Sequence, residues 1–388
     1  MKYKLVLSTA IGLLLLGGLV AQACNVPVFR YALEHWRSDP YRVTLLHRGP
    51  LGAEESKLLA ELQDRQDQSQ ANVQVRAVDV ATLDKETEDN AVDRELLAGQ
   101  QELDLPRLVV QYPQHLKIEL PIWSAPLARE SLDGLLASPV RKQLIERLAA
   151  GQTAVWLLLE SGDADQDDAA FELLTAELKE LEGSLELPEL TDAPEDNLLA
   201  APPLGITFSL LRVPRGEAEV ALVPMLLHSE SDLPGLDAPM VFPVFGRGRA
   251  LLPLVGAGIT PENIRGSAAF LVGACSCEVK ELNPGFDLLL SADWDELLFV
   301  DGKAPAALAR GEPAADAPAV LVPIPTGSQA PALTAAPTPS GTVHPASAAA
   351  AFRTVAPLYV IGGISLTCVV LAVGLAVFVG MFGGTPKH

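Results

Sequence analysis

Apolar residues recur with two different periods between residues 28 and 272, and the change of period predicts alternating strands and helices. Val73, Val75 and Ala77 alternate with polar neighbours, which predicts a strand over 72–80. Leu58 and Leu62 share one helical face and predict a helix over 54–66. The same reasoning predicts helices over 28–36 and 138–150, strands over 41–47, 107–112 and 116–120, and a polar helical stretch ending near residue 101.

The order of these elements then recurs along the chain. Strands are predicted over 154–160 and 206–213, helices over 168–183, 217–227 and 261–272, and a hairpin over 240–245 and 250–255. The hairpin turn Gly246-Arg247-Gly248-Arg249 is rich in glycine, as tight reversals require. Alternating strands and helices closed by a hairpin predict an α/β fold with mixed sheets covered by helices on both faces.

This order, present twice in tandem, resembles the thioredoxin fold. Thioredoxin-like domains carry a cis-proline before the third strand of this pattern, and Pro106 and Pro239 stand at that place in the two halves. The resemblance implies a first thioredoxin-like domain with an N-terminal helix over 24–151 and a second thioredoxin-like domain over 152–302.

The resemblance does not extend to the redox motif of the thioredoxin family, Cys-Gly-Pro-Cys after the first strand. The first half has Arg48-Gly49-Pro50-Leu51 in that place, and the second has Ser161-Gly162-Asp163-Ala164. Both sulfurs are missing from each motif, so thioredoxin redox chemistry is not expected.

The two ends of the chain predict export and membrane attachment. Residues 1–23 have the basic start, apolar run and Ala21-Gln22-Ala23 ending of a signal peptide, with an uncleaved anchor or lipidation at Cys24 as alternatives. The uncharged run from Pro357 to Gly384 predicts a transmembrane helix over 355–384, followed by a cytoplasmic tail over 385–388. Between body and helix, the Ala- and Pro-rich composition predicts a disordered linker over 303–352.

The formal net charge of −21 limits the classes of partner that the chain is expected to bind. Such a surface repels phosphate backbones, so nucleic-acid binding is not expected. The chain also lacks an Asn-x-Ser/Thr acceptor, which favours a bacterial periplasm or cell envelope over a eukaryotic exterior. We therefore expect another envelope or membrane protein as the partner.

Three cysteines belong to the exported part, namely Cys24, Cys275 and Cys277. A disulfide from Cys24 to one of the other two would staple the mature N-terminus to the second domain, as an oxidising compartment favours. Buried free thiols are a second interpretation. A third is thiol–disulfide exchange or binding of a soft ion such as Cu(I), which is the only cofactor the sequence brings into question.

No nucleophile-and-base motif, nucleotide loop or histidine metal pair occurs in the sequence, so an enzyme is not the favoured interpretation. Arg247 and Arg249, unusual on so acidic a chain, are candidates for binding an anionic partner, with a solvated turn as the simpler interpretation. The sequence thus predicts a non-enzymatic, membrane-anchored binding or scaffolding protein, with a thiol- or copper-handling protein as the alternative.

Overall fold

The computed structural model describes residues 24–83, 91–98, 104–118, 120–275 and 279–299. The predicted signal peptide, linker, transmembrane helix and cytoplasmic tail all lie outside these residues. Within the described ranges, no helix is both long and apolar enough to span a membrane.

The first sheet has four strands in the order β2-β1-β3-β4. Strand β1 (Tyr41–His47) pairs in parallel with β2 (Val73–Asp79). On its other side β1 pairs antiparallel with β3 (Arg107–Gln111), which in turn pairs antiparallel with β4 (Trp123–Pro126). The sheet is therefore mixed.

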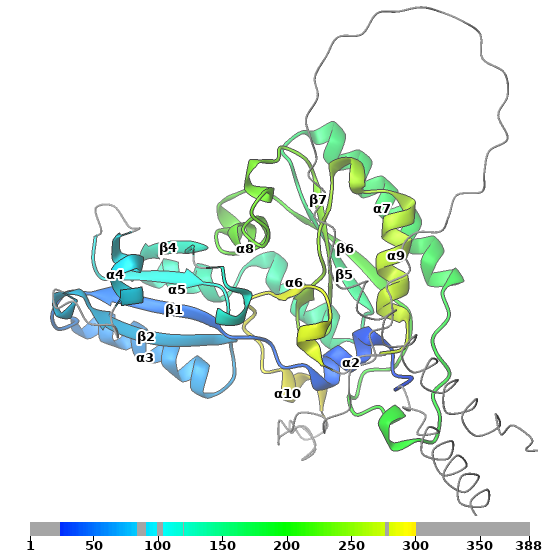
Figure 1. The fold of residues 1–388 in the computed structure, drawn as a ribbon, viewed down its shortest axis with the longest axis horizontal. Helices are drawn as coiled ribbons and strands as arrows, with labels where there is room; N and C mark the ends of the chain where they lie inside the picture. Colours follow the sequence, from blue (N-terminus) through cyan, green and yellow to red (C-terminus); the bar gives the residue numbers. More distant parts are fainter. Residues whose placement is uncertain (1–23, 84–90, 99–103, 119, 276–278, 300–388) are drawn as a thin grey trace, which may run out of the picture. The chain divides into compact units, whose positions relative to one another are not determined.

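Helices lie on both faces of this first sheet. Helices α3 (Ala53–Asp67) and α5 (Arg129–Leu136) contact each other, and their leucines pack with one face of β1 (Figure 1). Helix α4 (Ala91–Ala98) places Leu96 with Leu46 of β1 in a separate cluster on the other face. The side chains of β1 are thus divided between two apolar layers, as strand geometry requires.

The second sheet repeats the topology of the first. Strand β5 (Ala154–Leu159) pairs in parallel with β6 (Phe208–Val213) and antiparallel with β7 (Met240–Phe245). Strand β7 continues antiparallel to β8 (Arg249–Ala250), so the order β6-β5-β7-β8 matches β2-β1-β3-β4. Two further short strands extend it, with β10 (Phe286–Asp287) on β8 and β9 (Leu254–Val255) on β7.

The helices of the second sheet come from distant parts of the chain. Helices α7 (Ala164–Ser184) and α9 (Pro261–Val272) cover one face together with α2 (Val28–His35) (Figure 1). Helices α6 (Pro139–Ala149) and α8 (Leu222–Leu227) contribute to the core on the other face. Helices α2 and α6 therefore pack against the second sheet, although both precede residue 152.

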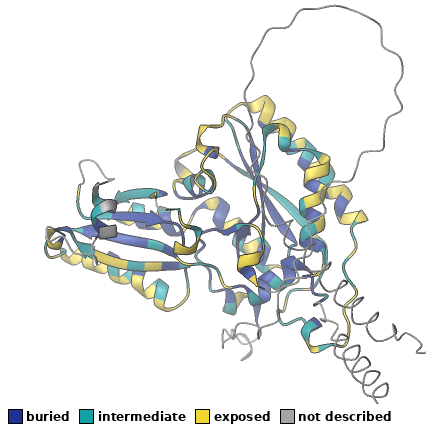
Figure 2. Cartoon of the chain, viewed as in Figure 1, coloured by how far each residue is buried: buried dark blue, intermediate teal, exposed yellow. Residues whose placement is uncertain are grey.

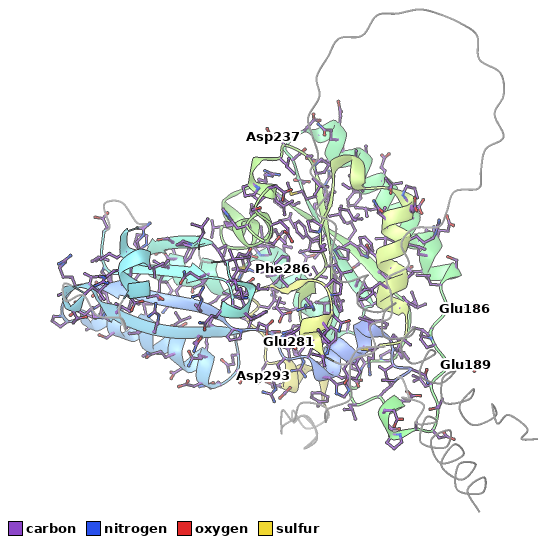
Figure 3. All side chains as sticks on the ribbon, in the orientation of Figure 1. Glu186, Glu189, Asp237, Glu281, Phe286 and Asp293 are labelled. Carbon is purple, nitrogen blue, oxygen red and sulfur yellow. The ribbon has the colours of Figure 1, made fainter. Side chains whose placement is uncertain are left out.

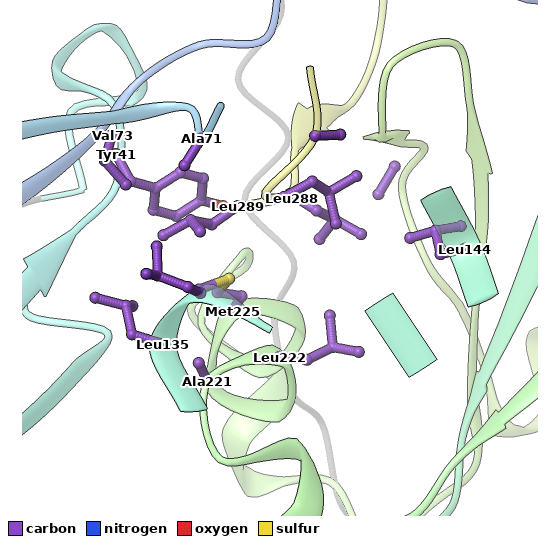
Figure 4. Packing of buried hydrophobic residues seen from close by; sticks show 14 of the residues in the cluster. Tyr41, Ala71, Val73, Leu135, Leu144, Ala221, Leu222, Met225, Leu288 and Leu289 are labelled. Atoms are coloured by element: carbon purple, nitrogen blue, oxygen red, sulfur yellow. The ribbon is translucent and has the colours of Figure 1, made fainter. Parts of the chain in front are cut away.

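The two sheets share one hydrophobic core. Tyr41 and Val73 of the first sheet belong to the same buried cluster as Leu289 from the segment after β10 (Figure 4). Leu135 of α5 joins Met225 of α8 in that cluster. The central strands β1, β3, β5 and β7 are largely buried, whereas the outer sides of α3 and α7 are exposed (Figure 2). The repeated sheets are thus continuous parts of one packed body.

The predicted α/β fold with two mixed sheets is confirmed. The main local difference concerns 116–120, where a strand was expected and the structure has a short 3-10 helix, η3 (Gln114–Leu116). Lys117 follows with a positive φ of 55°, a conformation that interrupts extended backbone. The remaining elements are α10 (Trp294–Leu298) and the short 3-10 helices η1 (Val80–Thr82), η4 (Pro194–Asp196), η5 (Glu217–Glu219), η6 (Leu233–Gly235), η7 (Gly256–Gly258) and η8 (Lys280–Leu282).

Candidate functional site

The turn after β1 is closed by its own hydrogen bonds. The Gly49 backbone N–H donates to Asp79 Oδ1 at 3.1 Å, and Nδ1 of His47 lies 2.8 Å from the Gly49 carbonyl oxygen. Hydrogen bonds from the backbone N–H groups of Ala81 and Gly49 lower the pKa of Asp79. A carboxylate therefore fixes the turn after β1, which contains Arg48 and Gly49.

A carboxylate also fixes the corresponding turn after β5. Asp167 is buried and accepts hydrogen bonds from the Ser161 backbone N–H at 2.7 Å, the Ser161 hydroxyl at 2.9 Å and the Gly162 N–H at 3.0 Å. Charged acceptors form strong bonds to backbone donors, so this turn is held firmly. Neither turn contains a cysteine thiol.

The two candidate prolines differ in their peptide bonds. The Leu105–Pro106 bond is cis, and it is the single cis bond in the described part of the chain. The Ala238–Pro239 bond is therefore trans. Both prolines directly precede the antiparallel third strand of their sheet, although only Pro106 has the isomer that the resemblance implied.

The N-terminal segment forms a short strand-like pairing with the chain after α9. Pro27 pairs antiparallel with Ala274, the Cys275 N–H donates to the Val26 carbonyl oxygen at 2.9 Å, and the Val28 N–H donates to that of Gly273 at 2.9 Å. Cys24 and Cys275 are both buried, and Cys277 lies outside the described residues. The structure thus places Cys24 and Cys275 on neighbouring segments of the chain.

We expect this pairing to direct the disulfide staple to Cys277. Cys24 stands three residues before Pro27, and Cys277, which lies outside the described residues, stands three residues after Ala274 in the sequence. Mass spectrometry of non-reduced peptides should find Cys24 linked to Cys277, and Cys275→Ser should leave that link intact. Three reactive thiols in the exported body would contradict this prediction.

Asp196 of η4 anchors the same N-terminal segment. Its carboxylate accepts from the Asn25 backbone N–H at 2.7 Å, the Asn25 side-chain amide at 3.0 Å, the Thr191 N–H at 2.8 Å and the Thr191 hydroxyl at 2.6 Å. These bonds, that of the Thr191 hydroxyl first, hold the pKa of Asp196 well below its usual range. The folded state therefore favours the ionised form of Asp196.

This lowered pKa predicts a pH dependence of stability. Because the folded pKa lies below the unfolded value of about 3.9, the contribution of Asp196 is complete above that value and is lost as the pH falls toward the folded pKa. In thermal unfolding, the difference in midpoint between the wild type and Asp196→Asn should be constant above about pH 5 and shrink in more acidic buffer. A difference that stays constant down to about pH 2 would contradict this prediction.

Arg247 and Arg249 are not exposed binding residues, and this expectation from the sequence was wrong. Arg247 is buried and donates to the carbonyl oxygens of Leu33 at 2.9 Å and Glu34 at 3.2 Å. Arg249 is buried and donates to the carbonyl oxygens of Asn283 at 2.8 Å and Pro284 at 3.2 Å. The turn is covered by α2 and by the segment before β10. Both guanidinium groups therefore form their hydrogen bonds with buried parts of the protein.

Arg249 also belongs to a buried charge cluster around Asp287. The carboxylate of Asp287 lies 3.3 Å from Arg249 and accepts from the Lys280 ammonium at 2.5 Å and the Asp39 backbone N–H at 2.6 Å. Lys280 reaches Asp39 as well, at 2.9 Å. Burial, and next the charge of Asp287, raise the pKa of Asp39. This cluster ties the residues before β1 to the edge of the second sheet.

A cavity of about 630 Å³ forms an apolar groove that is lined from both halves of the chain. We name it the seam groove. Its lining consists of Tyr112, Leu116, Ile118, Leu120, His228, Ser229, Glu230, Ser231, Pro234, Leu252, Gly285 and Phe286. Ligand pockets typically measure about 300–1,000 Å³, so the seam groove has the capacity of a binding site.

Aromatic rings form the rigid floor of the seam groove. Tyr112 and Phe286 are both buried and meet edge to face, with ring centroids 6.2 Å apart; Phe286 is labelled in Figure 3. The Tyr112 hydroxyl donates to the Met225 carbonyl oxygen. Burial, and next the charge of Glu230, raise the pKa of Tyr112 far above its usual range. Tyr112 therefore stays a neutral donor.

The rim of the seam groove is apolar and open to solvent. Leu120 is 73% exposed and Leu252 is 55% exposed, whereas large apolar side chains generally lose their solvent contact on folding. The sequence did not single out these residues, and it assigned Leu116, Ile118 and Leu120 to a strand. Their alternation was the available signal, because it marks apolar side chains on one side of an extended segment.

Outside the cysteines, no metal centre is indicated. In the portion that the structure describes, no group of three or more His, Cys, Asp or Glu side chains is placed to hold a metal ion. Comparison with protein-family models, curated proteins and solved structures gives no match for this chain. The seam groove is therefore the candidate functional site on its geometry alone.

Proposed function

We propose that this chain is a non-enzymatic, membrane-anchored extracytoplasmic binding or scaffolding protein that holds its partner in the seam groove. The observation that carries the proposal is an apolar cavity of about 630 Å³ with exposed leucines at its rim. Exposed apolar patches on soluble bodies mark interaction sites, because water contact with them is unfavourable.

The proposal includes two tandem thioredoxin-like domains. The shared order β2-β1-β3-β4 and β6-β5-β7-β8, with one parallel and two antiparallel pairings in each, supports this interpretation. So do the paired helices on one face of each sheet, α3 with α5 and α7 with α9. The repeat creates a boundary between two like units, and the seam groove is lined from both sides of it.

The absence of sulfur from both family turns supports a role without catalysis. In the resemblance, Arg48 and Leu51 stand at the cysteine places of the first turn, and Ser161 and Ala164 at those of the second. Asp79 and Asp167 hold these turns through hydrogen bonds. A thiolate is the nucleophile of disulfide exchange, and neither turn supplies one. A binding role needs only the shape of the surface.

The composition of residues 1–23 and 355–384 supports a location of this binding body outside the cytoplasm. We propose that residues 1–23 direct export, that residues 355–384 anchor the chain in a bacterial envelope membrane, and that 303–352 space the body from the bilayer. A tethered body of this kind suits an accessory subunit of a membrane complex, which makes another envelope or membrane protein the expected partner.

A second candidate function uses the cysteines. The pairing of Pro27 with Ala274 brings Cys24 to the chain that leads into Cys275 and Cys277, where thiol exchange or Cu(I) binding would require them. Cys275→Ser with Cys277→Ser should abolish insulin reduction or copper binding if this candidate is correct. If the wild-type protein shows neither activity, the candidate fails.

Co-purification with a matched pair of variants tests the main proposal. Leu252 in the seam groove and Leu297 in α10 are 55% and 46% exposed, so aspartate at either site should change folding stability little. We expect Leu252→Asp to lose the protein that accompanies the full-length chain from its native membrane, and Leu297→Asp to keep it. Equal recovery with both variants would overturn the proposal.

A further inference from the structure

The lining of the seam groove contains a single carboxylate. This carboxylate belongs to Glu230, and the imidazole of His228 is the only basic group among the lining residues. Lys117 lies between the lining residues Leu116 and Ile118 in the sequence, but it is exposed and is not part of the lining. An occupant of the groove therefore meets apolar surface on most sides and one carboxylate, with the serine hydroxyls of Ser229 and Ser231 beside it.

The apolar surface also extends past the cavity. Leu282, three residues before Gly285 in the chain, is 54% exposed, and Leu252 at the rim is 55% exposed. A small molecule held inside the cavity would contact Leu252, which lines it, and would leave Leu282 in water. A chain segment that enters the groove and crosses its rim would cover both leucines, which favours a protein occupant.

From this arrangement we infer that the seam groove accepts an apolar segment of a partner protein that carries a lysine or arginine side chain opposite Glu230. The inference rests on the proposed function and adds the chemistry of the partner. The net charge of −21 also favours a partner segment with a basic side chain, because it attracts basic segments and repels acidic ones. The apolar contacts supply affinity, and Glu230 selects among apolar segments.

Three synthetic peptides test this inference on the full-length protein in lipid nanodiscs. They share one leucine-rich sequence and differ at a single position, which is Lys, Gln or Glu. Binding is measured by calorimetry, with empty nanodiscs as the blank. Because Glu230 is exposed, we expect the Lys peptide to bind about two- to five-fold more tightly than the Gln peptide, and the Glu peptide to bind most weakly.

Variants of the protein separate the inference from the proposed function. Glu230→Gln should remove the preference for the Lys peptide without weakening the Gln peptide, and Glu230→Lys should make the Glu peptide the tightest. An unchanged preference in Glu230→Gln would overturn the inference and leave the proposed function standing. If no peptide binds the wild type more tightly than it binds Leu252→Asp, both fail.

Discussion

Replacement of Asp287 by asparagine is expected to lower the free energy of unfolding by about 3–5 kcal/mol, because it leaves the buried Arg249 without its carboxylate partner and leaves Lys280 with Asp39 as its carboxylate partner. Asp287 is buried, and its carboxylate meets both Lys280 and Arg249. It also accepts the backbone N–H of Asp39 at 2.6 Å, while its own carbonyl oxygen accepts the Tyr41 hydroxyl at 2.7 Å. The substitution therefore weakens the link between β1 and the second sheet.

Chemical denaturation measures this effect, and Asp168→Asn is its matched control. Asp168 forms an ion pair with Arg212 at 2.7 Å, but its side chain is 62% exposed. Exposed pairs contribute about 0.2–1 kcal/mol, so the control should unfold close to the wild type. Equal destabilisation by the two substitutions would show that the buried cluster does not hold the sheets together.

Arg30→Met is expected to cost a similar amount, because it leaves Glu34 buried without its cation. Arg30 donates to Glu34 Oε1 at 2.6 Å and to the carbonyl oxygens of Ala200 at 2.6 Å and Pro202 at 2.8 Å. Glu34 also accepts the Ala200 N–H at 3.0 Å. The pair thereby fastens α2 to the loop before β6, and a loss of about 3–5 kcal/mol is expected.

The double variant Arg30→Met, Glu34→Leu separates the cost of an unpaired charge from the cost of lost packing. Replacing both partners of a buried pair by apolar side chains is often close to neutral, whereas removing one is costly. We expect the double variant to be more stable than Arg30→Met in the same denaturation assay. A double variant that is less stable than the single one would contradict this account of the pair.

Elements with strong periodicity were predictable from the sequence. The strand over 41–47 and the helix over 261–272 agree with β1 and α9, and each is bounded by local signals such as the Thr260 cap before Pro261. Helix α10 and strand β10 were not predicted. Both are short, and they form where the chain after α9 packs against the second sheet. Their secondary structure is therefore determined by tertiary contacts, and no hydrophobic periodicity in the sequence reveals it.

The strand predicted over 116–120 failed for an instructive reason. Leu116, Ile118 and Leu120 alternate as a strand requires, but alternation reports only that one side of an extended segment is apolar. Here that side lines the seam groove, whose opposite wall comes from residues 228–234. No local pattern identifies a partner surface that lies more than a hundred residues away in the chain.

The burial of Arg247 and Arg249 was unpredictable for the same reason. A Gly-Arg-Gly-Arg turn has the composition of an exposed reversal, and only the structure shows α2 and residues 283–287 over it. The cavity itself depends on how two like sheets meet. The sequence indicated a repeated fold and a missing redox motif. The binding surface forms only where the two sheets pack together, and the sequence does not show that packing.

Site-specific photo-crosslinking tests the central claim most directly, because it reports contact at the seam groove in the native membrane. A photoreactive phenylalanine analogue would replace Leu252 in one variant and Leu297, a comparably exposed leucine outside the groove, in another. We predict a discrete adduct with a second protein from position 252 and none from position 297. Adducts of the same kind from both positions, or from neither, would contradict the claim that the groove holds the partner.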